Sequence, residues 1–167
     1  MTEVGARWSV RPIEPSDRDW LREVLAVRWG GPWQAYGGEL VDAARADGLL
    51  ACDAASVRAG FLLHRPVAVG WEIVLLDAFQ PGRGIGTALV GACETAARAA
   101  GASRLAVMTT NDNLRALRFY QRRGFKLVAL RPGAVDAARC ELKASIPETG
   151  EHGILICDEI VLNLGLA

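Results

Sequence analysis

A glycine-rich turn at residues 79–89 is the part of the sequence best suited to holding a ligand, and it reads Phe-Gln-Pro-Gly-Arg-Gly-Ile-Gly-Thr-Ala-Leu. Gly82, Gly84 and Gly86 let the main chain approach a ligand closely and point successive N–H groups at it. Because a helix is predicted to begin here, its dipole adds partial positive charge at the same place. Arg83 adds a formal charge, so the turn predicts a site for a diphosphate group.

Two common phosphate-binding motifs fit this turn poorly. A P-loop ends in Gly-Lys-Ser or Gly-Lys-Thr, whereas Gly86 and Thr87 have no lysine between them. The dinucleotide fingerprint needs GxGxxG after the first strand and an acidic residue about 20 positions later. Here the spacing is GxGxG, late in the chain, and Arg104 and its neighbours supply no such acid. A purely structural turn remains a third interpretation, because isolated glycine patterns are weak signals.

A second pattern, further along the chain, places one tyrosine on a stripe of a predicted helix. Asn113, Ala116, Tyr120 and Gly124 are three or four positions apart, so they share one helix face. Geometry alone leaves two interpretations open. The stripe is either core, with the Tyr120 hydroxyl bonded to a buried partner, or the tyrosine does chemistry.

Hydrophobic periodicity supplies the elements that must position these residues. Apolar residues recur every three or four positions from Ile85 to Ala100, and Gly101 stands where a C-terminal cap belongs, which predicts a helix after the glycine turn. Before the turn, three strands read as an antiparallel meander; after the helix come a buried strand, a helix and another strand. The ranges are 49–53, 57–64 and 69–79 for the first three strands, then 104–109, 113–123 and 125–130. This order predicts an α+β fold.

The remaining segments are assigned from shorter signals. A first or edge strand at 8–12 stops at a proline, and Ser16 and Asp17 offer caps for a helix through about Val27. Residues 29–38 are rich in glycine and aromatics, which suits a mobile loop or short helix and not a core element. Short helices are expected at 39–45 and 135–143, and a last strand at 154–164.

Composition excludes several classes of protein. A length of 167 residues predicts one domain over 1–167, and a formal net charge of zero argues against nucleic acid as the main partner. The start of the chain lacks the apolar run of a signal peptide, and no stretch approaches the ~20 apolar residues of a membrane span. Four cysteines without a CxxC pair and two histidines offer no metal cluster. We therefore expect a cytoplasmic, metal-free protein with reduced thiols.

Two motifs in this order make residues 7–130 resemble the GCN5-related N-acetyltransferase (GNAT) family. That family's pyrophosphate loop, Gln/Arg-x-x-Gly-x-Gly, is matched by Gly84 and Gly86, with Gly82 and Arg83 before them. Pro81 stands where Gln or Arg is usual, so any contact made by that N–H is lost or passes to a neighbour. The family's second motif, Asn-x-x-Ala-x-x-x-Tyr-x-x-x-Gly-Phe, is matched in register by Asn113, Ala116, Tyr120, Gly124 and Phe125.

The resemblance implies a fold and an activity. The fold is a central, mixed, mostly antiparallel twisted sheet of about seven strands flanked by helices in an α/β/α arrangement. The activity is acetyl-CoA-dependent transfer of an acetyl group to a primary amine by direct attack on the thioester, without a metal, in a bacterial cytoplasm. A non-catalytic acyl-CoA-binding regulatory module is the alternative, and a homodimer is compatible with the family.

The resemblance also implies roles for single residues. Glu72 is the first candidate for the base that deprotonates the amine and Asp77 the second, although an exposed strand carboxylate without a role stays an open interpretation. Tyr120 would donate a hydrogen bond to the thiolate leaving group, and the main chain near Leu75 and Leu76 would bind the thioester carbonyl or the pantetheine arm. The other expected cofactor contacts are Gly82, Arg83, Gly84, Ile85, Gly86, Thr87, Asn113 and Ala116.

The acceptor amine, a small molecule or a peptide, is expected between residues 29–38 and 147–158. Four acids hint weakly at a cationic amine: Glu72, Asp77, Asp158 and Glu159. A basic cluster follows Asn113, and a solvated helix face is favoured for it over contact with the cofactor's 3′-phosphate. Its members are Arg115, Arg118, Arg122, Arg123 and Lys126.

Overall fold

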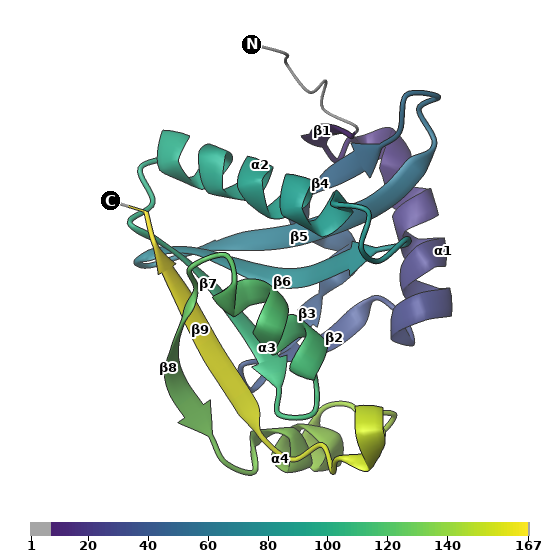
Figure 1. The fold of residues 1–167 in the computed structure, drawn as a ribbon. Coiled ribbons are helices and arrows are strands. Elements are labelled where there is room, and N and C mark those ends of the chain that lie inside the picture. Colours follow the sequence, from purple (N-terminus) through teal and green to yellow (C-terminus); the bar gives the residue numbers. More distant parts are fainter. Residues whose placement is uncertain (1–7, 167) are drawn as a thin grey trace.

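A seven-stranded sheet runs through the middle of the protein, whose computed structural model describes residues 8–166 (Figure 1). The strands lie in the order β1-β4-β5-β6-β7-β9-β8, and β6–β7 is the parallel pair among antiparallel neighbours. Their bounds are β1 Ser9–Pro12, β4 Asp47–Cys52, β5 Arg58–Val67, β6 Gly70–Ala78, β7 Arg104–Thr110, β8 Lys126–Arg131 and β9 Glu159–Gly165. The predicted α+β class and mostly antiparallel sheet are confirmed. Residues 1–7, on which the predicted lack of a signal peptide rests, lie outside the described part.

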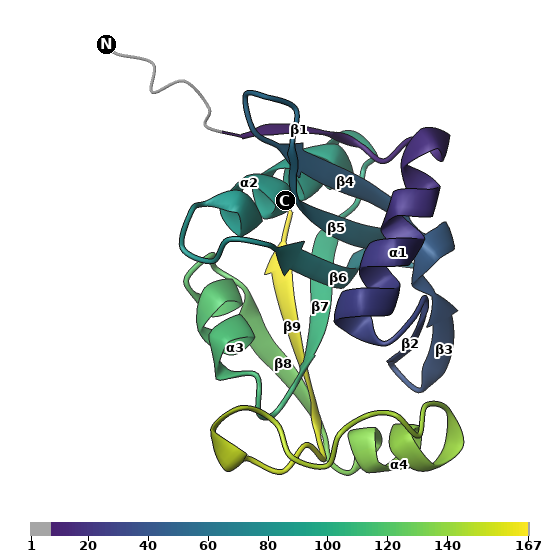
Figure 2. The same ribbon diagram turned by 90° about the vertical axis from the view of Figure 1, so that its right-hand side faces the viewer.

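Helices cover both faces of the sheet (Figure 2). They are α1 Arg18–Trp29, α2 Ile85–Ala99, α3 Leu114–Gln121 and α4 Ala134–Glu141, with 3-10 turns at Pro15–Asp17, Ala43–Arg45 and Glu151–Gly153. The chain buries two apolar clusters, one beneath α2 and α3 and the other beneath α1. Because successive strand residues point to opposite faces, Leu62 of β5 belongs to the first cluster and its neighbour Phe61 to the second.

Strands β6 and β7 separate halfway along their length. Their parallel pairing covers Trp71 to Ile73 on β6, and β6 then continues to Ala78 without a β7 partner. At the same place the β5–β6 register shifts by one residue, so Val74 is an extra residue on β6. A bulge bends its strand and increases the local twist, which is consistent with the separation. The main chain of β6 beyond Ile73 is thus open on the β7 side.

Residues 29–45 differ from the sequence prediction of loops and short helices. Two strands, β2 Trp33–Tyr36 and β3 Glu39–Asp42, form a separate hairpin, and the 3-10 turn follows them. Gly37 and Gly38 make its two-residue turn with φ of 63° and 85°. Two successive positive φ angles match the right-handed twist of a hairpin and favour Gly-Gly. The dipeptide was therefore a hairpin signal, and the prediction of a non-core loop is wrong, since Tyr36 is buried.

The predicted helix at 135–143 and the predicted strand at 154–164 are both present, but the strand is shorter than predicted. α4 ends at Glu141, close to the predicted helix, whereas β9 begins at Glu159, five residues after the predicted start of that strand at 154. The residues before β9 are held by an isolated bridge between Thr149 and Leu155 and by the 3-10 turn between them. They fold back on themselves and do not extend the sheet.

Candidate active site

A cleft of about 1060 Å³ lies where β6 and β7 separate. Its walls come from the C-terminal halves of β6 and β7, the glycine turn with the start of α2, the outer face of α3, and the end of α1 with β2. These elements are far apart in the sequence, so the cleft is a product of the sheet order. Of the predicted site residues it brings together Leu75, Leu76, Asp77, Gly82, Gly84, Ile85, Gly86, Thr87, Asn113, Ala116 and Tyr120. Glu72 and Arg83 are not among the residues that line it.

The glycine turn has the conformation that its sequence predicts. Gly84 is the N-terminal cap of α2 with a φ of 84°, a left-handed value that side chains disfavour. Gly86 follows in the first turn of the helix, where an added Cβ would lie 3.1 Å from Cζ of Phe119. The Trp8 indole donates to the Arg83 carbonyl at 2.8 Å and ties the turn to β1. The turn is therefore fixed from both sides.

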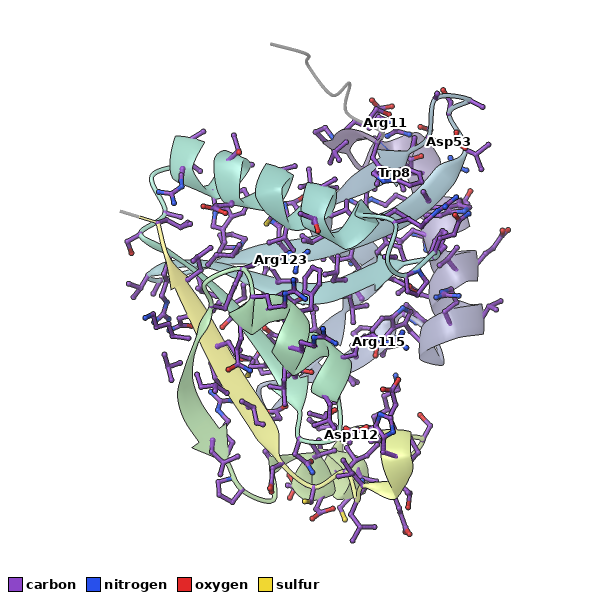
Figure 3. All side chains as sticks on the ribbon, viewed as in Figure 1. Trp8, Arg11, Asp53, Asp112, Arg115 and Arg123 are labelled. Atoms are coloured by element: carbon purple, nitrogen blue, oxygen red, sulfur yellow. The ribbon has the colours of Figure 1, made fainter. Side chains whose placement is uncertain are left out.

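Four arginines form the wall of the cleft that faces this turn: Arg115, Arg118, Arg122 and Arg123. Figure 3 shows Arg123, which follows the end of α3, beside α2, and Arg115, in the first turn of α3, further from α2. The Arg123 guanidinium stacks on Phe119, 3.5 Å from its ring centre, and donates to the Thr87 hydroxyl in the first turn of α2. Arg115, Arg118 and Arg122 are exposed, as the favoured interpretation expects, and Arg123 is half-buried. The cluster also forms a wall of the cleft, which is the position that the less favoured interpretation, contact with the cofactor, requires.

Tyr120 is buried with its ring against Phe119 and Phe125, and it is one of the residues that line the cleft. Within residues 8–166 the hydroxyl makes no hydrogen bond, so it is available to a ligand. Burial raises the pKa of Tyr120, and the neighbouring Cys93 raises it further. The hydroxyl therefore stays protonated at neutral pH and is a donor. Burial raises the pKa of the Cys93 thiol to about 12, and Cys93 is fully buried in the first apolar cluster, so it is no nucleophile.

Tyr36 is a site residue that the sequence prediction passed over. From β2 it reaches the point where the β6–β7 ladder ends, and its hydroxyl donates to the Ile73 carbonyl at 2.9 Å. The same hydroxyl accepts from the Met108 N–H at 3.2 Å. The hydroxyl thus bridges the Ile73 carbonyl and the Met108 N–H at the point where the pairing of β6 with β7 ends. Burial raises the pKa of Tyr36 and keeps the hydroxyl protonated.

Asn113 and Ala116 stand at the start of α3. The Asn113 side-chain oxygen accepts from the Ala116 N–H at 3.0 Å, which makes Asn113 the N-terminal cap of the helix. Asn113 lines the cleft, and its side-chain NH₂ group has no partner within the described residues. The second motif therefore shapes the helix start and offers a donor to a ligand.

Comparison with known proteins decides the family. The family model described as "Acetyltransferase (GNAT) family" matches residues 18–125, which contain the glycine turn, the strand separation and Tyr120. The chain belongs to the GNAT acetyltransferases. No cluster of three or more potential metal ligands occurs within residues 8–166 of this family member. No helix in the same range has the length and apolar character needed to span a membrane.

This acetyltransferase has relatives and structural neighbours that match nearly its whole length. The uncharacterised protein YdhI of Bacillus subtilis strain 168 is 38% identical over 143 residues, covering 86% of this chain and 89% of YdhI. A GNAT acetyltransferase of Elizabethkingia anophelis with acetyl-CoA bound superposes with a TM-score of 0.66 at 20% identity, covering 95% and 98% of the two chains. A Bacillus subtilis acetyltransferase in complex with CoA gives 0.66 at 19%, covering 96% and 99%.

The carboxylates of this GNAT member are already paired within the protein. Asp77 accepts from Nε and Nη2 of Arg28 at 2.6 and 2.8 Å and from the Trp29 indole at 2.9 Å. Glu72 accepts from Arg65 at 3.0 Å through one oxygen. Asp158 and Glu159 accept from main-chain N–H groups, at 2.8 and 3.3 Å. Asp77 is the one of these four acids that lines the cleft, and Arg28 neutralises its charge, so the four acids place no unpaired carboxylate in the cleft lining.

Proposed function

We propose that the protein is an acetyl-CoA-dependent N-acetyltransferase that moves the acetyl group directly from the thioester to a primary amine. The observation that carries the proposal is the meeting of three features in one cleft: the open edge of β6 beyond Ile73, the glycine turn at the start of α2, and the unbonded hydroxyl of Tyr120. An acyl-CoA has a matching order of groups, namely diphosphate, an amide-bearing arm and a thioester.

The cofactor would lie along this cleft with its diphosphate on the glycine turn. Main-chain N–H groups and the α2 dipole favour an anion there. The four cleft arginines match the ~4 negative charges that the phosphates of CoA carry at neutral pH, and Arg115, Arg118 and Arg122 have no ion-pair partner within the described residues. The pantetheine arm would follow β6, with Leu75 and Leu76 supplying main-chain partners and Asn113 a side-chain donor.

Tyr120 would act on the leaving group. The attack of the amine on the thioester carbon forms the new C–N bond and releases the CoA sulfur as a thiolate. A hydroxyl that is protonated and unbonded can donate to that sulfur as negative charge develops on it. The proton lost by the amine balances the one that the thiolate finally takes up. The buried Cys93 has no part in this route, so we propose no acyl-enzyme intermediate.

Two carboxylates compete for the role of base. Asp77 lines the cleft, but three donors occupy its oxygens; Glu72 keeps one oxygen without a partner among residues 8–166 but lies outside the lining. The pH dependence of kcat for Asp77→Asn and Glu72→Gln separates them. Loss of the acidic limb of the pH profile in one variant identifies the base, and retention of that limb in both means that solvent takes the proton.

The first test is calorimetric titration with acetyl-CoA, with NAD and ATP as competing candidates. We expect selective binding of acetyl-CoA that is lost in Gly84→Val and kept in the matched control Gly91→Val, because an added Cβ at exposed Gly91 of α2 meets no atom within 4 Å. Failure to bind acetyl-CoA would refute the proposal.

A non-catalytic acyl-CoA-binding module is the second candidate, and the pairing of both carboxylates with arginines is the observation in its favour. It predicts tight binding of acetyl-CoA without amine-dependent release of CoA for any amine in a broad panel. Amine-dependent release that is lost in Tyr120→Phe excludes it.

A further inference from the structure

The charges along the cleft are distributed unevenly between its two ends. Four arginines stand at the end formed by α3 and the glycine turn. At the other end, beside α1 and β2, the charged side chains of the lining are Arg28 and Asp77. Arg28 and Asp77 neutralise each other in an ion pair of 2.6 Å. A cationic acceptor would therefore find no unpaired carboxylate in the described lining.

The Arg28 guanidinium is held in one orientation. Its Nε and Nη2 atoms donate to the two oxygens of Asp77, and its plane lies over Phe79 with 5.1 Å between the guanidinium carbon and the ring centre. Asp77 is itself fixed by the Trp29 indole and is 9% exposed. Two hydrogen bonds and a stacked ring leave the side chain little rotational freedom. Its orientation is thus set before any substrate arrives.

One edge of this guanidinium has no partner in the protein. Arg28 uses the side formed by Nε and Nη2, and within residues 8–166 its Nη1 atom makes no hydrogen bond. The side chain is 45% exposed and lines the cleft. The free edge, formed by Nη1 and the second hydrogen of Nη2, has the fork geometry that binds a carboxylate through two parallel hydrogen bonds.

A second cation lies behind the same corner. The Lys143 ammonium donates to the Trp29 carbonyl at 3.0 Å and to the Gln34 side-chain oxygen at 3.1 Å. It has no carboxylate partner among the described residues, so it adds positive potential at this end of the cleft. The free donor edge of Arg28 and the charge of Lys143 both favour an anionic group on the substrate.

We propose that Arg28 binds the carboxylate of the acceptor, so that the acceptor is an amine that also carries a carboxylate, of the amino-acid class. The inference rests on the proposed N-acetyltransferase function and adds the substrate class. Asp77 is then a positioning residue, which aims the guanidinium of Arg28 and holds it in place. The acceptor's carboxylate would bind to the free edge of Arg28, and the amine of the same acceptor molecule would reach the thioester.

The test compares each of the twenty amino acids with its own carboxamide as acceptor, following CoA release with acetyl-CoA as donor. The two members of a pair differ by the charge of one group and almost nothing in size. A charge-assisted pair of hydrogen bonds predicts a kcat/KM about 10- to 100-fold higher for the acid, expressed mainly in KM. The carboxamide has the less basic amine, so intrinsic reactivity at neutral pH favours it and cannot produce this preference.

Variants of Arg28 then assign the preference to its side chain. In Arg28→Gln we expect the acid and the carboxamide to become equivalent, and in Arg28→Lys a partial preference to remain. Arg22→Gln is the matched control, because Arg22 is exposed on the same helix and pairs with Asp19. The double variant Arg28→Gln with Asp77→Asn removes both charges, which avoids a buried unpaired carboxylate if the single variant folds poorly.

The possible outcomes distinguish this inference about the acceptor from the proposed N-acetyltransferase function on which it rests. Acetylation of amines with no preference for the carboxylate, or a preference that survives Arg28→Gln with unchanged KM, overturns the inference and leaves the N-acetyltransferase standing. Failure of every acid and carboxamide to release CoA, while another amine of the broad panel does release it, overturns the inference alone. Failure of every amine in that panel, together with tight acetyl-CoA binding, overturns both. A preference lost in Arg28→Gln and kept in Arg22→Gln, with the acetyl-CoA Kd unchanged in both variants, supports it.

Discussion

The two tyrosines of this chain offer a matched pair of single-atom deletions with opposite expected effects. Both tyrosines line the cleft and both are buried. The Tyr36 hydroxyl makes two hydrogen bonds to the main chain of β6 and β7, whereas the Tyr120 hydroxyl makes none within residues 8–166. Replacement by phenylalanine removes one oxygen and leaves the ring in place. We therefore expect Tyr36→Phe to lower stability and Tyr120→Phe to lower turnover.

The magnitude for Tyr36→Phe follows from what the hydroxyl satisfies. Its loss leaves the Met108 N–H and the Ile73 carbonyl without a partner in a buried place, which costs about 1–3 kcal/mol. For a chain of this size that corresponds to a fall in Tm of about 2–4 °C per kcal/mol. Because the ring still fills its site, no cavity term is added. Turnover at saturating substrates should be largely retained.

The magnitude for Tyr120→Phe has the reverse pattern. Removing a hydroxyl that has no partner in the protein should change the free energy of unfolding by less than about 0.5 kcal/mol. Removing the donor to the leaving thiolate should lower kcat by ~10²-fold while acetyl-CoA binding is spared. Tyr120 would then be a catalytic residue and Tyr36 a structural one.

Two measurements on each variant decide between these expectations. Urea denaturation gives the free energy of unfolding, and CoA release with a competent amine gives kcat. If Tyr36→Phe is as stable as the parent, the hydrogen bonds of the Tyr36 hydroxyl to β6 and β7 contribute nothing to stability, and the structural role given to Tyr36 is wrong. If Tyr120→Phe turns over at the parent rate, Tyr120 has no part in the mechanism.

Two further pairs of variants test the framework around the site. Gly86→Ala should destabilise the fold by about 1–2 kcal/mol and weaken acetyl-CoA binding, because its Cβ would press on Phe119 at 3.1 Å. Gly91→Ala in the same helix should instead stabilise the fold by about 0.5–1 kcal/mol. Equal denaturation midpoints for the two variants would contradict this expectation. Asp17→Asn should cost about 2–4 kcal/mol at pH 7, because Asp17 is 1% exposed and accepts from two arginines, whereas the 95% exposed Asp19→Asn should change stability by less than about 0.5 kcal/mol. Hydrogen bonds, above all from Arg11, hold the pKa of Asp17 well below its ordinary value of 3.8, so its contribution to stability is fully present above pH 3.8 and is lost as the pH falls through the lowered pKa. A parent and an Asp17→Asn variant that lose stability in parallel on acidification would refute that assignment.

The elements and two of the site's parts could be predicted from the sequence because they are local. The glycine turn and the helix after it occupy consecutive residues, and Gly84 caps that helix as the pattern indicates. The spacing from Asn113 to Tyr120 is a helical spacing, and α3 presents both to one cleft. The hairpin at Gly37 and Gly38 was also a local signal, although the aromatic and glycine content around it favoured a loop.

The acceptor end of the cleft was decided by tertiary structure alone. Arg28 and Asp77 are 49 positions apart, and Tyr36 is 37 positions from Ile73 and 72 from Met108. Periodicity reports which residues share a face of one element, and it carries no information about which faces meet. Asp77 therefore read as a free acid, and Tyr36 as part of a surface loop. The packing of α1 against the bulged strand β6 pairs Asp77 with Arg28, and the packing of the β2–β3 hairpin makes Tyr36 the bridge between β6 and β7.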